Sequence, residues 1–245
     1  MIKASTENTE NINKATSSLA LECTSVSKKY GSLNALKGVN IGVEKGHIVG
    51  LLGPDGAGKT SLVKLICGLT RGGRGKILVD GKRIRPKDIS YQPEYPFVNS
   101  NQRVGDLFEM YRAFYSDFNA KRASALLKKA EISLDDKFGC LSRTSIQKAE
   151  TIFVMSRNAK LYILDEPITA VEPKSRDFII KVIISCCGAD SGVLITSSIA
   201  TQLEKILDEV YIIHKGEIKL SSTSEDIMNT YGKTVSGFYR EAFRC

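Results

Sequence analysis

The amino-acid sequence predicts an α/β fold, in which strands of a sheet alternate with helices along the chain. Residues 46–53 (GHIVGLLG) form an apolar run bounded by glycines, which is typical of a strand covered on both faces. Residues 60–69 then repeat apolar side chains at helical spacing. Two further short apolar runs, LYIL at 161–164 and VLIT at 193–196, predict additional strands.

The remaining elements follow from the same kinds of pattern. Residues 96–157 are rich in helix formers and contain no strand-like run, so they predict a helical insertion. Pro173 suits the first turn of a helix, and the apolar residues after it recur on one helical face. The run VYIIH at 210–214 is followed by KGEI, which predicts a strand and a hairpin turn.

Composition indicates an ordinary globular protein. The 245 residues are 42% hydrophobic and 25% charged, so the chain is long enough to bury one large core, or a core with a subdomain. The 6 cysteines are scattered without CxxC spacing, which suits neither a disulfide framework nor a zinc site. We interpret them as small buried hydrophobes in a reducing compartment.

The sequence contains no segment that is long and apolar enough to cross a bilayer. Its most hydrophobic helix candidate, residues 178–187, is short and carries Lys181. The first twenty residues lack the apolar centre of a secretory signal and carry Glu7 and Glu10. We therefore expect an intracellular protein that reaches a membrane only through a partner.

The chain is basic, with 35 Lys and Arg against 27 Asp and Glu, for a net charge of +8. Such a charge is compatible with a nucleic acid, an anionic membrane surface or an anionic ligand. Because the basic residues form no long block, charge alone does not choose among these.

A glycine-rich loop joins the first apolar strand to the helix after it. Gly53, four residues, then Gly58, Lys59 and Thr60 match a phosphate loop, the Walker A pattern. Its glycines let backbone N–H groups point inward, and the following helix N-terminus attracts anionic oxygens. We expect Lys59 to reach the terminal phosphates and Thr60 to bind Mg²⁺. The predicted nucleotide-binding residues of the loop are Gly53, Pro54, Asp55, Gly56, Ala57, Gly58, Lys59, Thr60 and Ser61.

Two carboxylates follow the strand at 161–164, in the sequence LYILDEP, a Walker B pattern. Asp165 is placed to hold the Mg²⁺ shell, and Glu166 could orient and deprotonate an attacking water. Acidic residues just past a strand are also common as helix caps, so the pair takes its functional meaning from the phosphate loop. With that loop present, we predict Glu166 and Lys59 as catalytic residues.

These motifs, taken together, resemble the nucleotide-binding domains of ABC transporters from residue 21 onward. Tyr30, in SKKYG, matches the aromatic residue on which adenine stacks in that family. ISYQPE at 89–94 lies where the family has its Q-loop. The usual glutamine aligns with Glu94, a third candidate metal ligand, but Gln92 lies two residues earlier, and the choice between them stays open. Ser142 in LS lies twenty-three residues before Asp165, which matches the family spacing for the signature helix.

The resemblance implies a P-loop NTPase (RecA-like) core with an antiparallel β subdomain and an inserted α-helical subdomain. It implies ATP and Mg²⁺ as ligands, a second ATPase subunit, a membrane-spanning transporter subunit, and a cytoplasmic location at the inner face of the cell membrane. The tail is similar to that of ABC-2-type exporters, whose short ATPase chain serves separate membrane subunits. The expected divisions are a polar mobile extension at 1–20, an ATP-binding core at 21–95 and 158–220, a helical subdomain with the signature at 96–157 and a C-terminal extension at 221–245.

The sequence also departs from the family pattern. The signature LSGGQ is replaced by LSRTS, so Arg143 and Thr144 place side chains where glycines permit close approach. Ser198 stands at the position of the switch histidine, and Glu172 stands where the D-loop has aspartate. The only 2 histidines, at 47 and 214, fall within other strand patterns, and we expect neither to substitute.

A positioned acid–base group is typically worth about 10²- to 10⁴-fold in rate, so loss of the histidine predicts slow hydrolysis with ATP binding retained. The alternative is that Ser198 and a water perform the same task. Since each ATP in the family lies between one subunit's phosphate loop and the other's signature, a homodimer of this chain would have two weakened sites. We therefore predict a slow ATPase with a long-lived ATP-bound dimer, which could be paired with a different ATPase chain.

Three function classes remain at this stage. The first and favoured one is the ATP-binding subunit of an ABC transporter. The second is a pseudo-ATPase subunit that binds ATP and regulates a transporter or sensor without significant turnover. The third is a non-transport ABC ATPase of DNA repair or translation, but those proteins carry long coiled coils or tandem domains, and we expect no nucleic-acid partner.

Overall fold

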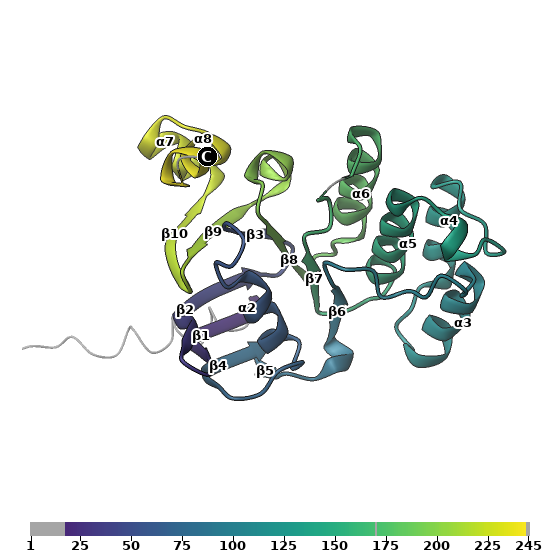
Figure 1. The fold of residues 1–245 in the computed structure, drawn as a ribbon, viewed down its shortest axis with the longest axis horizontal. Coiled ribbons are helices and arrows are strands. Elements are labelled where there is room, and N and C mark those ends of the chain that lie inside the picture. The colour runs from purple at the N-terminus through teal and green to yellow at the C-terminus, as the bar shows by residue number, and fades with distance from the viewer. Residues whose placement is uncertain (1–17, 170, 244–245) are drawn as a thin grey trace, which may run out of the picture.

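The computed structural model describes residues 18–169 and 171–243, and two sheets organise them (Figure 1). The larger sheet has six strands in the order β10, β9, β3, β8, β7, β6. Five of these strands run parallel and β10 is antiparallel to β9. The strands are β3 (Ile48–Leu52), β6 (Ile89–Gln92), β7 (Leu161–Asp165), β8 (Gly192–Ser197), β9 (Glu209–His214) and β10 (Glu217–Thr223).

The central strands are apolar runs because both faces of this sheet are covered. Every residue of β3, β7 and β8 is buried. One face packs on α2 (Lys59–Ile66) and the smaller sheet, and the other on α6 (Pro173–Cys186) and the end of α5 (Arg143–Met155). This burial on both sides explains why the short runs at 161–164 and 193–196 predicted strands correctly.

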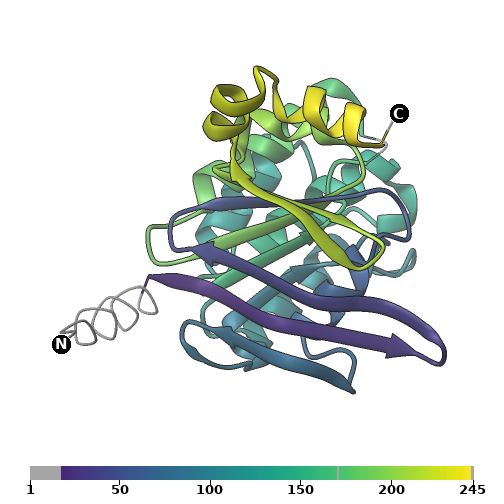
Figure 2. The ribbon, with the colours of Figure 1, turned by 90° about the vertical axis from the view of Figure 1, so that its left-hand side faces the viewer.

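The smaller sheet is antiparallel, with the strand order β2, β1, β4, β5, and lies across the face shown in Figure 2. Its strands are β1 (Leu19–Tyr30), β2 (Leu33–Glu44), β4 (Gly73–Val79) and β5 (Lys82–Arg83). A tight turn at Gly31, with a φ of 57°, joins β1 to β2. The predicted core with an antiparallel subdomain is therefore confirmed.

The inserted helices form a separate core. Helices α3 (Val104–Phe114), α4 (Ala120–Lys129) and α5 surround an aromatic cluster of Phe108, Tyr111, Phe118 and Phe153. The ring centroids of Phe108 and Phe118 lie 5.5 Å apart in an edge-to-face arrangement. The predicted helical insertion is thus present, and it packs on the larger sheet through α5.

The chain ends in two helices, α7 (Ser224–Tyr231) and α8 (Val235–Phe243). Buried Ile227, Val235 and Tyr239 attach them to the core on one face of the larger sheet. The remaining elements are the short 3₁₀ helices η1 (Pro86–Asp88), η2 (Phe138–Cys140), η3 (Ala200–Gln202) and η4 (Glu204–Ile206). Among the described residues, no helix has both the length and the apolar character needed to cross a bilayer.

Several elements differ in extent or environment from the sequence-based expectation. Strand β1 begins at Leu19, inside the expected extension at 1–20, where Ala20 is fully buried; residues 1–17 of that extension lie outside the described residues. Strand β10 continues to Thr223, past the expected core boundary at 220, because it pairs with β9 along its whole length. His47 precedes β3 rather than lying within it. The described cysteines are free thiols, but Cys140 is exposed rather than buried.

Candidate functional site

Loops at one edge of the larger sheet line a hollow of about 800 Å³. They follow β3, β6, β7 and β9, whose carboxyl ends share that edge because these strands are parallel. The turn between β1 and β2 supplies the rest of the wall. The predicted site residues that line the hollow are Tyr30, Asp55, Gly56, Ala57, Gly58, Lys59, Thr60, Ser61, Glu94 and Glu166.

The loop between β3 and α2 requires glycine where backbone packs directly on backbone. A Cβ on Gly53 would lie 2.4 Å from the carbonyl oxygen of Ile213. A Cβ on Gly58 would lie 2.8 Å from the carbonyl oxygen of Ala35, and its φ of +115° disfavours any other residue. These contacts fix the loop on the strands beneath it. The first turn of α2, with its free backbone N–H groups, therefore starts beside the hollow.

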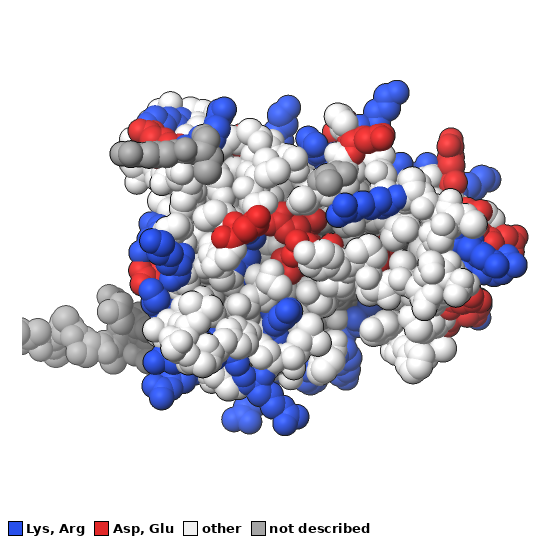
Figure 3. All heavy atoms as spheres, viewed as in Figure 1, with Lys and Arg blue, Asp and Glu red and all other residues white. Residues whose placement is uncertain are grey.

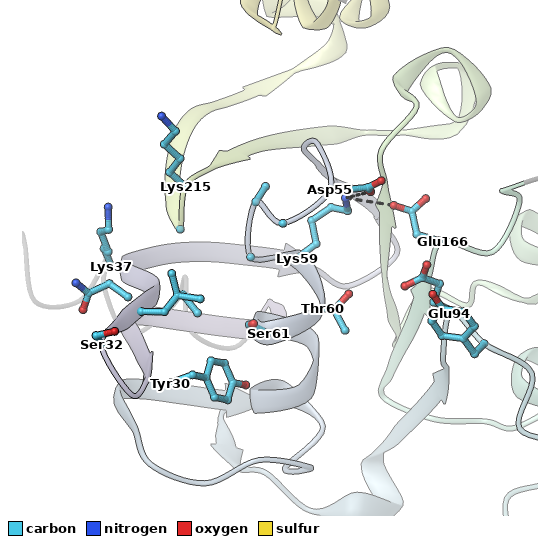
Figure 4. Close-up of a pocket in the computed structure, with 18 residues that line it drawn as sticks. Tyr30, Ser32, Lys37, Asp55, Lys59, Thr60, Ser61, Glu94, Glu166 and Lys215 are labelled. Carbon is cyan, nitrogen blue, oxygen red and sulfur yellow. Dashed lines mark ion pairs between the residues drawn. The ribbon is translucent and has the colours of Figure 1, made fainter.

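Lys59, the first residue of α2, is only 6% exposed and turns back over the loop. Its Nζ donates a hydrogen bond to the carbonyl oxygen of Gly53 at 2.6 Å, and lies 3.3 Å from that of Pro54. The same nitrogen lies 3.3 Å from Glu166 Oε1 and 3.9 Å from Asp55 Oδ1 (Figure 4). This buried ammonium therefore faces anionic oxygens, which is the environment that a phosphate chain would also supply.

Asp165 is fully buried at the end of β7, opposite Thr196 of β8. Its Oδ1 accepts a hydrogen bond from Thr196 Oγ1. Burial raises the pKa of this carboxyl, and the hydroxyls of Thr196 and Thr60 oppose that shift. Its Oδ2 is buried and accepts no hydrogen bond of ordinary geometry from the described residues. An unused carboxylate oxygen beside a threonine hydroxyl suits a hard cation, so Asp165 and Thr60 fit Mg²⁺.

Glu166, the residue after Asp165, has a strained backbone conformation. Its φ of 50° lies in the left-handed region, which costs about 1 to 3 kcal/mol for a residue of this kind. Its N–H donates to Thr196 Oγ1 at 3.1 Å, and its Oε2 accepts from Thr169 Oγ1 at 2.7 Å. These contacts aim the carboxylate at Lys59 and the hollow (Figure 4).

Two residues of the site, Thr196 and Thr169, were missed at the sequence level. Thr196 orients both Asp165 and Glu166, although it lies about thirty positions away along the chain. Only the register of β7 on β8, which pairs Asp165 with Thr196, brings it there. A hydroxyl at the end of the VLIT run was the one available signal.

The two candidates in the Q-loop region lie in different environments. Glu94 lines the hollow, and burial together with the charges of Asp165 and Glu166 raises the pKa of its carboxyl. Gln92 has no exposed surface, and its Oε1 accepts a hydrogen bond from Thr151 Oγ1 at 3.0 Å. Of the two, only Glu94 faces the hollow. Among the described residues, no three His, Cys, Asp or Glu side chains come close enough to hold a metal ion by themselves.

Tyr30 ends β1 at the far side of the hollow from Glu166 (Figure 4). Tyr30 is 43% exposed, so a planar ligand could stack on its ring. The ammonium of Lys28 lies 4.8 Å from the ring centroid and also donates to the carbonyl oxygen of Arg71. Since Lys28 is nearly buried, this cation–π contact holds the ring against the sheet.

The predicted site residues that do not line the hollow are Gly53, Pro54, Asp165, Ser142 and Ser198. Ser142 is exposed at the N-cap of α5, where its Oγ accepts a hydrogen bond from Ser145 N at 3.1 Å. Arg143 is exposed beside it. Ser198 is half-buried just after β8. A single copy of the chain therefore does not bring the signature serine to its own hollow.

The surface charge shows no single basic stripe on the face that carries the hollow. In Figure 3, acidic side chains gather near the middle of this face, and basic side chains spread around its margin. A continuous basic surface is the usual footprint of a nucleic-acid-binding protein. No stripe of that kind crosses this face, and the expected absence of a nucleic-acid partner stays a prediction.

Comparison with known proteins finds relatives along most of the chain. A sequence model of the family described as ABC transporter matches residues 36–169, just over half of the chain. The lipopolysaccharide export system ATP-binding protein LptB of Haemophilus influenzae is 30% identical over 223 residues, which cover 85% of this chain and 92% of that protein. The linearmycin resistance ATP-binding protein LnrL of Bacillus subtilis is 27% identical, over 91% of this chain and 77% of its own length. A solved ATP-binding subunit of an ABC transporter matches with a TM-score of 0.83 at 24% identity, over 92% of this chain and 98% of that one.

Proposed function

The chain belongs to the ABC transporter family as an ATP-binding subunit, and we propose that it hydrolyses ATP slowly and couples this to transport by separate membrane subunits. The observation that carries the proposal is the buried Lys59, which lies at the start of α2 and faces the hollow that ends at Tyr30. The triphosphate of ATP would bind at the loop, and its adenine ring would stack on Tyr30 at the other end of the hollow.

Binding follows from the charges at the loop. The terminal phosphates would replace the carbonyl oxygens of Gly53 and Pro54, and the Glu166 carboxylate, as partners of the Lys59 ammonium. Thr60 and Asp165 would hold Mg²⁺, which when bound supplies charge stabilisation to the phosphate oxygens. The adenine would stack on the exposed face of Tyr30.

Hydrolysis requires a base, and Glu166 is the carboxylate that the fold holds beside Lys59. Thr169 and the Thr196 hydroxyl fix its orientation, so that it could accept a proton from a water that attacks the terminal phosphate. Ser198, after β8, has no imidazole with which to hold that water or phosphate. The expected result is a slow chemical step with nearly normal binding.

The partners are a membrane-spanning subunit and a second ATPase subunit, with the chain at the inner face of the cell membrane. Apolar side chains exposed on the loop after β6 and on α3 support docking at these segments. Tyr95 and Phe97 are 73% and 39% exposed on the loop, and Met110 and Phe114 are 40% and 79% exposed on α3. A partner seated on the loop would contact the same segment that carries Glu94 to the hollow.

Calorimetric titration of the purified chain with Mg·ATP tests the proposal. We expect Lys59→Ala to weaken ATP binding by about a hundredfold, since it removes a charge-assisted contact from a buried site. Lys64→Ala is the matched control, because Lys64 lies on the same helix but is exposed, and it should bind ATP as the wild type does. If the wild type shows no binding, or if both variants bind equally well, the proposal fails.

A further inference from the structure

Helix α5 is hydrogen-bonded to the two loops that bring Glu94 and Glu166 to the hollow. Gln147 Nε2 donates to the carbonyl oxygen of Pro167, in the loop that follows Glu166, at 3.0 Å. Glu150 Oε1 accepts from the backbone N–H of Phe97, in the loop that follows Glu94, at 2.8 Å. Thr151, one residue further along α5, donates to Gln92 as described above. Three side chains within two turns of one helix therefore reach three separate points around the site.

Glu150 is the least expected of these residues in a protein interior. It has no exposed surface, and its Oε2 accepts no hydrogen bond from the described residues. Burying a carboxyl with half of its acceptors unused costs free energy, and an apolar side chain of similar size would serve the core better. Stability alone therefore does not explain a glutamate at this position.

Glu150 attaches the loop of residues 93–98 to helix α5. Residues 93–98 leave the end of β6 and enter the helical insertion, and over this stretch Tyr95 is 73% exposed and Phe97 is 39% exposed. The bond to Phe97 N fixes the chain three residues after Glu94. Because the acceptor side of that bond, the Glu150 carboxyl, has no exposed surface, water competes for it less than for a fully exposed bond.

We propose that Glu150 is a positioning residue, which holds the loop of residues 93–98 on helix α5 so that Glu94 stays directed at the nucleotide. Ser142 is the N-cap of the same helix, so the loop, the segment after Glu166 and the signature position are all attached to α5. This inference rests on the proposed function, because it concerns the geometry of that same site. It predicts that the acceptor oxygen of Glu150, rather than its charge or volume, is what matters.

Two substitutions of nearly equal volume separate these possibilities. Glu150→Gln keeps an acceptor oxygen for the Phe97 N–H and removes the charge. Glu150→Met keeps the length of the side chain and removes the acceptor, and its apolar side chain should leave the protein folded. Thermal unfolding of both variants provides the check on folding.

Hydrogen exchange of the Phe97 amide and single-turnover ATP hydrolysis are then measured on the full chain. We expect Glu150→Met to speed exchange at Phe97 by about tenfold and to slow hydrolysis by about tenfold, with ATP affinity changed by less than about threefold. Glu150→Gln should match the wild type in all three measurements. This separation of rate from affinity, with rescue by the variant that keeps the acceptor, is not expected of a residue that serves stability alone.

Equal exchange at Phe97 in the wild type and Glu150→Met would overturn the inference. Slowing of hydrolysis to the same extent in both variants would also overturn it, because the charge would then be what matters. If none of the three proteins binds ATP, the proposed function fails, and the exchange of Phe97 still decides whether Glu150 holds the loop.

Discussion

At the scale of single residues, the hollow places one buried ammonium among several carboxylates. Lys59 lies within 4 Å of Glu166 and Asp55, while Asp165 and Glu94 carry carboxyls whose pKa values are raised. Asp165 is shifted chiefly by burial, and so is Glu94, to which the neighbouring carboxylates add. Such a site gains from a bound divalent cation, because the cation removes the repulsion among its acidic groups.

The residue at position 198 sets the expected rate. Introducing the histidine of the family pattern, Ser198→His, should raise the rate of ATP hydrolysis by about tenfold or more, because it adds a group that can hold the terminal phosphate. Steady-state hydrolysis and ATP affinity measured together provide the check. An unchanged rate with normal folding would mean that Ser198 and a water already perform that task.

Glu150 also makes stability depend on pH. Burial raises the pKa of its carboxyl to about 7, against a usual 4.5 in an unfolded chain, while the backbone N–H groups at Phe97 and Val98 oppose the shift. Between these two pH values the folded state binds more protons than the unfolded state, so stability falls as pH rises. The full penalty, present above pH 7, is about 3 kcal/mol by linkage.

Urea unfolding of the wild type and Glu150→Gln at pH 5 and pH 8 measures this penalty. We expect the variant's advantage in unfolding free energy to grow by about 2 to 3 kcal/mol between those pH values. Parallel pH profiles for the two proteins would show that Glu150 ionises in the fold as it does in water.

At the scale of elements, the phosphate loop owes its shape to the strands beneath it. Gly53→Ala should destabilise the protein by about 2 kcal/mol or more and weaken ATP binding, because the new Cβ would meet the backbone of β9 at Ile213. Gly56→Ala is the matched control, since a Cβ there meets nothing within 4 Å and only its φ of +75° adds strain, of about 1 kcal/mol. Urea unfolding compares the two, and equal losses would contradict this account of the loop.

The elements that the sequence predicted well are those in which the local pattern and the tertiary environment agree. The runs at 161–164 and 193–196 are buried on both faces, so an unbroken apolar stretch was a sufficient signal. Strand β1 gave no such signal, because bulges near Ser25 and Lys28 interrupt its alternation, and the smaller sheet was expected only from the family resemblance.

The site residues also divide into those that local motifs predict and those that only the fold brings together. Lys59, Thr60, Asp165 and Glu166 lie in contiguous motifs that can be read directly from the sequence. Thr196 and Glu150 act through partners about thirty and fifty positions away, respectively, and only strand register and helix packing bring them together. Local patterns do not show which distant residues such side chains contact, which is why both residues were missed.

At the scale of the whole molecule, the position of Ser142 bears on assembly. It lies exposed at the start of α5 and does not line the chain's own hollow, so under the proposed function a signature contact to nucleotide would come from another subunit. Arg143 and Thr144 carry side chains where the family pattern has glycines. In the Glu166→Gln background, which should retain bound ATP, we therefore expect little homodimer from the chain as it stands.

Sedimentation velocity with Mg·ATP tests this expectation. Replacing Arg143 and Thr144 together by glycine should raise the association constant of the ATP-dependent dimer by about tenfold, because the signature backbone of one subunit can then approach the nucleotide of the other closely. The same proteins without nucleotide are the control. Full dimerisation of the unaltered LSRTS chain would remove the case for a different partner chain.

The decisive measurement is ATP binding and hydrolysis on the same purified chain with Mg²⁺, compared with Lys59→Ala and Glu166→Gln. We expect binding that weakens by about a hundredfold with Lys59→Ala, and slow turnover that falls to background with Glu166→Gln while binding remains. Tight binding with no turnover above the Glu166→Gln background would contradict this expectation, because the chain would then hold ATP without cleaving it.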